Sequence, residues 1–225
     1  MKEINLLGIS LIDYTLKESL RLSNHYLNNG ALNTILVVST RMLVEAAENE
    51  EYKQWIEAMD MTICGETDIL RATDSATRNR LKEVENGEFI REFFHRLAWN
   101  RKKVFLLSNS EQQMEYLKKK IEEIHSNMII VGQYILEDVS TGMDSFVNEI
   151  NDIVPNVIIS SMPHPQQEQL MYENRMKMNA NIWLALPEHS IVEAKKGIQA
   201  SKILTLFYKK VFKIRVSKYI DKKTQ

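Results

Sequence analysis

The chain has 225 residues, of which 44% are hydrophobic and 26% charged, with only seven glycines and four prolines. This is the composition of an ordinary globular protein, so disordered, collagen-like and low-complexity proteins are excluded. A chain of this length buries roughly 70% of its surface on folding and needs no metal or disulfide to stabilise its fold. The single cysteine, Cys64, cannot form an internal disulfide or a cysteine-type zinc site, which favours a reducing compartment.

The formal net charge of −1 hides a strong asymmetry. The stretch Lys202–Lys223 carries eight lysines or arginines against one acid, Asp221, so its charge is +7 and the rest of the chain carries −8. One basic end on a neutral protein suggests a local contact with an anionic surface and argues against nucleic-acid binding. Since no leader with a cleavage site and no long apolar window is recognised, we expect a cytoplasmic protein.

Short β-rich runs alternate with longer helical patterns, which predicts a parallel sheet with crossover helices. The seven expected strands are Ile4–Ile9, Thr34–Val38, Met61–Cys64, Lys103–Leu107, Met128–Gly132, Val157–Ser160 and Ile182–Leu186. The main expected helices are Met42–Ala58, Glu88–Trp99, Gln112–His125, Met143–Asp152 and Gln166–Met176. The pattern therefore predicts an α/β fold with an open, mostly parallel sheet and helices on both faces.

In such a sheet, ligands bind beyond the carboxyl ends of the strands, so the loops that follow the strands form the candidate site. The loop Gly65–Asp68 follows the third expected strand and carries two acids, of which Glu66 or Asp68 is a candidate general base. The structural alternative is that Thr67 or Asp68 caps the helix that follows.

The segment Met162–Glu168 has two prolines and a Gln-Gln-Glu run that enters a helix. Free N–H groups at this helix start would suit a phosphate or a sugar hydroxyl. The structural alternative is a proline at the helix start with an acid in the first turn, which needs no ligand. We expect Gln167 to face the cleft and Glu168 to accept backbone N–H bonds at the helix start.

Glycine-rich dinucleotide, P-loop and serine-hydrolase motifs are absent from the sequence, and so is an HExxH pair. The histidines are scattered along the chain at His25, His95, His125, His164 and His189. We therefore expect no metal and no cofactor.

Residues 203–220 form an amphipathic basic helix on a helical wheel. Its apolar face comprises Ile203, Leu204, Phe207, Tyr208, Val211 and Ile214. This pattern predicts contact with an anionic membrane through Lys209, Lys210, Lys213 and Arg215. The alternative is that the helix packs back on the sheet with its lysines in solvent. We expect two parts, an α/β domain over residues 1–200 and a basic helical appendage over residues 201–225.

In chain order, several segments resemble the WecG/TagA/CpsF family of bacterial glycosyltransferases, over most of the chain. The matching segments are Leu6–Asp13, Val44–Tyr52, Val104–Leu107, Ile150–Asn151 with Pro155–Val157, and, most specifically, Pro165–Glu168 followed by Asn174–Arg175. The resemblance implies a Rossmann-like fold and metal-independent, inverting transfer of a sugar such as N-acetylmannosamine. The donor would be a UDP-sugar and the acceptor a lipid-diphosphate-linked sugar, in the synthesis of teichoic acid or another cell-wall polysaccharide.

The resemblance also implies a basic C-terminal appendage that brings the enzyme to its lipid acceptor. We therefore expect a peripheral protein on the inner face of the membrane. For an active enzyme, we expect Glu66 or Asp68 as the base, and substrate contacts from Ser39, Arg41, Ser108, Asn109, His164, Gln167 and Glu168.

The chain departs from the family pattern in the loops that carry chemistry. Cys64-Gly65-Glu66 stands where the family has Pro-Asp-Gly with its proposed catalytic aspartate, and Val37–Thr40 replaces the family's Thr-x-Asn-Pro. These replacements leave open a second hypothesis, a catalytically inactive relative that serves as a binding or scaffold subunit. A homo-oligomer or a complex with another glycosyltransferase also stays open.

Overall fold

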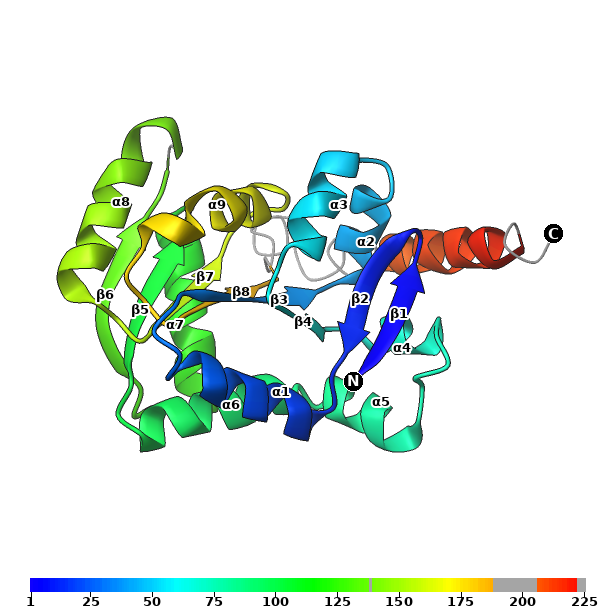
Figure 1. Ribbon diagram of the computed structural model, residues 1–225, viewed down its shortest axis with the longest axis horizontal. Coiled ribbons are helices and arrows are strands. Elements are labelled where there is room, and N and C mark those ends of the chain that lie inside the picture. The colour runs from blue at the N-terminus through cyan, green and yellow to red at the C-terminus, as the bar shows by residue number, and fades with distance from the viewer. Residues whose placement is uncertain (138, 188–205, 222–225) are drawn as a thin grey trace.

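The computed structural model describes residues 1–137, 139–187 and 206–221, and its centre is a parallel sheet (Figure 1). Six strands lie in the order β4-β3-β8-β7-β5-β6, and every neighbouring pair is parallel. They are β3 (Asn33–Val38), β4 (Met61–Cys64), β5 (Lys103–Ser108), β6 (Ile129–Ile135), β7 (Val157–Ser161) and β8 (Ile182–Leu186). The predicted open α/β fold is confirmed.

The first predicted strand is wrong, because Ile4–Ile9 spans a turn. β1 (Lys2–Leu6) and β2 (Ile9–Asp13) form a separate antiparallel hairpin, so the main sheet has six described strands instead of seven. Leu7 and Gly8 form the turn with φ angles of 55° and 86°, a conformation that glycine adopts without strain. Burial alternates along β2 and the second half of β1, so the apolar run belongs to two half-buried strands.

Helices cover both faces of the sheet (Figure 1). They are α1 (Leu16–Tyr26), α2 (Thr40–Ala46), α3 (Glu50–Glu57), α4 (Thr67–Arg71), α5 (Arg78–Glu85), α6 (Glu88–Trp99), α7 (Glu111–Ile124), α8 (Val139–Ile153) and α9 (Gln166–Asn174). The single helix predicted over Met42–Ala58 is wrong. The side chain of Asn49 accepts a bond from the N–H of Tyr52 and starts α3 as a new helix.

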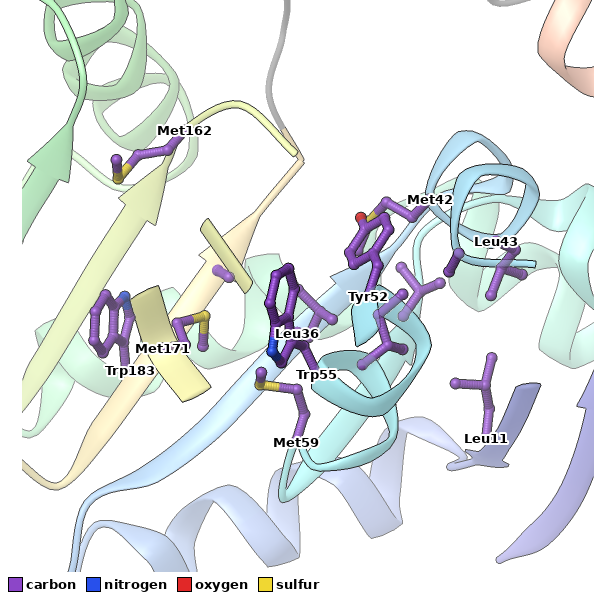
Figure 2. Close-up of a cluster of buried hydrophobic side chains, with 14 of the residues drawn as sticks. Leu11, Leu36, Met42, Leu43, Tyr52, Trp55, Met59, Met162, Met171 and Trp183 are labelled. Carbon is purple, nitrogen blue, oxygen red and sulfur yellow. The ribbon is translucent and has the colours of Figure 1, made fainter. Parts of the chain in front are cut away.

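The sheet separates two hydrophobic cores. The first joins the hairpin, α2, α3, α8 and α9 to one face of the sheet, and Figure 2 shows it from Trp183 and Met162 across to Leu11. Within it the indole N–H of Trp183 donates to Ser160 Oγ over 2.9 Å, so the buried ring has no unpaired donor. The second core lies between the opposite face and α1, α6 and α7.

A C-terminal helix of residues 206–221 packs against the first core. Phe212 is completely buried and Val216 nearly so, whereas Phe207 and Ile214 are exposed. Arg215 Nη1 donates to the carbonyl oxygen of Val44 over 3.2 Å. The predicted domain boundary near residue 200, together with Ile203 and Leu204 of the predicted apolar face, lies outside the described residues. Phe212 and Val216 of this helix therefore belong to the same hydrophobic core as the α/β domain.

Replacing Phe212 by alanine tests this docking. Because a fully buried aromatic side chain is lost, we expect Phe212→Ala to lower the free energy of unfolding by about 3–5 kcal/mol in urea titrations. Phe207→Ala on the exposed side of the same helix is the matched control and should change it by less than about 0.5 kcal/mol. Equal effects of the two substitutions would show that the helix does not dock through Phe212.

Candidate active site

The carboxyl edge of the sheet brings together the loops singled out in the sequence. Parallel pairing places the ends of β3, β4, β7 and β8 at the same edge. Ser39, Gly65, Met162 and Pro187 each follow one of these strands directly. This is the edge at which open α/β sheets bind their ligands.

Glu66 lies in the loop after β4 and reaches across to the start of α2. The backbone N–H of Thr40 donates to Glu66 Oε1 over 3.2 Å, and the Thr40 hydroxyl donates to Oε2 over 3.0 Å. Lys209 Nζ, from the C-terminal helix, lies 3.6 Å from Oε2. The Glu66 side chain keeps 23% of its surface exposed, so its carboxylate is held in place and still accessible.

Asp68 is nearly buried and faces two lysines of the C-terminal helix. Lys209 Nζ lies 3.2 Å from Oδ2, and Lys213 Nζ lies 3.3 Å from Oδ1. Burial by itself would raise the pKa of Asp68, but hydrogen bonds and charges from the two lysines outweigh it and lower the pKa below its ordinary value. A carboxylate in this environment holds an ion pair well and takes up protons poorly.

The capping alternative for this loop is not supported. Glu66 is the N-cap residue of α4, and no side chain makes a capping bond there. The carboxylate of Asp68 faces the C-terminal helix instead, which explains its burial by a contact that lies far away in the sequence.

His164, Gln167 and Glu168 lie together where β7 leads into α9. His164 Nδ1 is 2.7 Å from Glu168 Oε1, and both side chains are almost fully buried. The expectation that Glu168 accepts backbone N–H bonds at the helix start is wrong, because its described partner is the ring of His164. Gln167 is completely buried, does not line the cavity at this edge and donates through Nε2 to the carbonyl oxygen of Leu186 over 3.1 Å, so the expectation that it faces the cleft is not confirmed.

Two polar atoms at this edge are buried without a hydrogen bond to the described residues, Gln167 Oε1 and, across the edge, Asn109 Oδ1. The Tyr52 hydroxyl lies against the carboxylate of Glu168 and interacts with it. Burial first, and then the negative charge of Glu168, raises the pKa of Tyr52, so its phenol is neutral and can donate. Buried polar atoms are nearly always paired in folded proteins, so Gln167 Oε1 and Asn109 Oδ1 are candidate contacts for a polar ligand or water.

The other predicted substrate contacts have structural partners. Ser39 Oγ accepts a bond from the N–H of Met42 and caps α2, and Ser108 Oγ donates to the Ser110 carbonyl oxygen over 3.0 Å. Arg41 Nε bonds to Glu45 Oε1 over 2.8 Å, and its guanidinium lies over the ring of Tyr208. A substrate role for these residues stays a prediction.

The predicted membrane-contacting cations are divided between two sides of the helix. Lys209 and Lys213 pair with Asp68, and Arg215 Nη2 contacts Glu48 Oε1 over 2.5 Å. Lys210 is exposed beside Phe207 and Ile214, on the side that faces away from the domain. The helix thus packs back on the domain as the alternative interpretation had it, but two of its lysines are paired instead of solvated.

A cavity of about 280 Å³, which no sequence motif indicated, lies beneath the same edge, between the sheet and α1, α5, α6 and α7. Gly65, Ser161, Leu186 and Pro187 line its end at the strand termini. Its walls are mainly apolar. The lining residues of α6 and α7 recur every three or four positions, and an ordinary core helix has the same pattern, so the sequence alone does not reveal the cavity. Burial first, and then the charge of Asp13, raises the pKa of the lining thiol Cys64 to about 12, so this group is neutral.

Within the described part of the chain, no three histidine, cysteine or acidic side chains come together in a way that could hold a metal ion. Across the same residues, no helix is both long and apolar enough to span a bilayer.

The fold defines an open α/β protein, and its candidate ligand site is at the carboxyl ends of the parallel strands. The family model described as "Glycosyl transferase WecG/TagA/CpsF family" matches residues 4–205, and the chain belongs to this family. The resemblance inferred from the motifs is thereby confirmed. No curated protein matches the chain.

The ion pairs of Asp68 make stability depend on pH. Because the pKa of Asp68 is lowered in the folded protein, its ionised form adds stability above about pH 4, and this contribution is lost as the pH falls below that value. We expect Asp68→Asn to lower the free energy of unfolding at pH 7 by about 1 kcal/mol, and the deficit to shrink towards pH ~3.

Thermal and urea unfolding between these pH values measures the difference. Asp74→Asn is the control, because Asp74 is exposed and no contact of its side chain is described. A deficit of Asp68→Asn that stays constant across the whole pH range would contradict the ion pairs as its cause.

Proposed function

We propose that this protein transfers a sugar from a UDP-sugar to a lipid-diphosphate-linked acceptor in the synthesis of a cell-envelope polysaccharide. Family membership is the observation that carries the proposal. The carboxyl edge supports it, since acidic, amide and imidazole side chains gather there beside buried polar atoms without partners. The proposed sugar is N-acetylmannosamine or a close relative.

Glu66 is the proposed general base. It is more exposed than Asp68, and its neighbours hold its carboxylate at the edge of the sheet. In the transfer, the acceptor hydroxyl gives its proton to Glu66 while its oxygen bonds to the anomeric carbon. The bond from that carbon to the UDP phosphate oxygen breaks, and the electron pair leaves with UDP. Asp68, paired with Lys209 and Lys213, holds the C-terminal helix against the site.

We further propose that the outward side of the C-terminal helix meets an anionic membrane. Leu206, Phe207 and Ile214 are exposed there, each by about half of its surface or more, and Lys210 and Lys218 flank them. Apolar side chains with lysines beside them are the pattern of a helix that lies in a membrane interface. Because the opposite side is docked, the domain would be held with its carboxyl edge close to the lipid.

A catalytically inactive relative is the second candidate. One observation favours it: Gly65 stands at the position of the family's proposed catalytic aspartate, and its Cβ would lie 2.9 Å from Val37 Cγ1 and from the carbonyl oxygen of Val38. No larger residue fits at this position without a shift of the neighbouring strand. The protein would then bind a glycosyltransferase or its substrates without turnover.

Release of UDP discriminates between the two candidates. With UDP-N-acetylmannosamine and a lipid-diphosphate-linked sugar, we expect turnover by the full chain and a loss of about 10²-fold or more in Glu66→Gln, because the base is removed. Glu122→Gln, an exposed acid on α7, is the control and should keep the wild-type rate. Full activity of Glu66→Gln would reject this base, and no UDP binding by the folded protein would reject the enzyme.

Flotation with anionic vesicles tests the membrane contact. We expect the full chain to bind vesicles that contain phosphatidylglycerol at low salt and to bind less at high salt, because lysine attraction is screened. The double substitution Phe207→Ser and Ile214→Ser should abolish binding without unfolding the domain, since both residues are exposed. Binding that is insensitive to both changes would contradict this orientation of the helix.

A further inference from the structure

We propose that the cavity between the sheet and α5, α6 and α7 binds a single aliphatic chain, that of the lipid-linked acceptor. Most of its walls are apolar or aromatic. The apolar lining includes Val37, Ile63, Val84, Phe89, Ile90, Phe94, Leu117 and Ile121. Walls of this kind favour an apolar ligand, because contact with water is lost on both surfaces.

Most polar groups around the cavity are paired with each other, and the exception is Arg80 Nε, which is buried without a hydrogen bond to the described residues. Arg80 Nη2 donates to Asp13 Oδ1 over 2.6 Å, and Nη1 contacts Glu83. Glu83 also accepts a bond from the N–H of Leu16, and the Ser19 hydroxyl donates to the Leu16 carbonyl oxygen. A sugar ring placed here would leave most of its hydroxyl groups without partners, which is costly in a buried site.

The charge at this end of the cavity also disfavours a phosphate. Arg80 stands between two acids, Asp13 and Glu83, so the cluster carries a net negative charge. On α7, the partly exposed lining residue Lys120 pairs with Glu123 over 2.8 Å. A diphosphate is therefore disfavoured in the interior, and we expect the charged head of an amphiphilic ligand to stay outside.

The cavity reaches the carboxyl edge at the positions where the candidate site begins. Gly65 precedes Glu66 directly, and the carbonyl oxygen of Leu186 accepts the bond from Gln167. An aliphatic chain inside the cavity would thus leave its head group at this edge, beside Glu66. A volume of about 280 Å³ is near the lower end for small-molecule sites, so it suits one segment of a single chain.

This inference rests on the proposed function for the identity of the ligand, and a binding experiment separates the two. The probes are ethyl, octyl and dodecyl diphosphate below their micelle-forming concentrations, titrated calorimetrically into the full chain. Each buried methylene should tighten binding by up to about fourfold until the cavity is full. Inorganic diphosphate should bind at least 10-fold more weakly than the dodecyl compound.

Substitutions that fill the cavity show where the chain binds. Val84 on α5 and Ile90 on α6 line the cavity. We expect Val84→Trp and Ile90→Trp each to weaken the binding of dodecyl diphosphate at least 10-fold. Lys82→Trp, exposed on α5, is the matched control and should leave binding unchanged. If circular dichroism shows that a tryptophan variant does not fold, Ile63→Phe, a smaller change at another lining residue, replaces it in the test. Phe207→Ser with Ile214→Ser should retain binding, which excludes the outward side of the C-terminal helix as the binding surface.

Two outcomes would overturn the inference. One is an affinity that does not depend on chain length, and the other is unchanged binding in the folded cavity-filling variants. Tighter binding of a short two-chain phospholipid than of dodecyl diphosphate would overturn the acceptor as the source of the chain. If chain binding follows the expected pattern while UDP release fails, the cavity assignment stands and the proposed transfer is rejected.

Discussion

Burial of the central strands on both faces is the constraint on which this structure depends. β7 and β8 lie in the middle of the sheet, and nearly all of their residues are buried between the two helical layers. A strand that is covered on both sides exposes only its ends, so polar side chains reach solvent where the strands terminate. The candidate site is at the carboxyl edge for this reason.

The C-terminal helix adds a second element to that edge. Burial of Phe212 stabilises the docked helix, whereas the ion pairs of Lys209 and Lys213 with Asp68 fix its position. The two kinds of contact constrain the helix differently. Apolar burial is non-directional and tolerates small shifts of the helix, whereas the energy of an ion pair depends on the distance between two particular groups. Docking on one side leaves the apolar residues of the other side free for a different surface.

The carboxyl edge has a polar rim and an apolar interior. The rim contains the partly exposed Glu66, the side chains of His164 and Gln167 are buried next to it, and the cavity is lined by the second core. Such a division matches an amphiphilic ligand better than a fully polar one, because each part of the ligand meets a surface of its own kind. The same arrangement is compatible with a protein that binds without turnover, because binding needs the surfaces and not the base.

Local pattern in the sequence determined the fold class, the family and most helix positions, because hydrophobic periodicity and motif spacing are properties of neighbouring residues. It also located the loops at the strand ends, since parallel strands expose their carboxyl termini together. It failed at Ile4–Ile9, where an apolar run hid a turn, and at Asn49, where a capping side chain divided a helix. Each failure comes from one or two residues within a continuous pattern, the turn Leu7–Gly8 and the cap Asn49.

Only the tertiary structure decided which charged groups meet. The pairing of Lys209 with Asp68 and of His164 with Glu168, and the cavity under Gly65, depend on how the layers pack. A basic amphipathic helix has the same wheel whether it lies on a membrane or on its own domain, so the sequence left both open. The packing of Phe212 into the core decided which side of the helix faces the domain, because transfer of that ring out of water lowers the free energy.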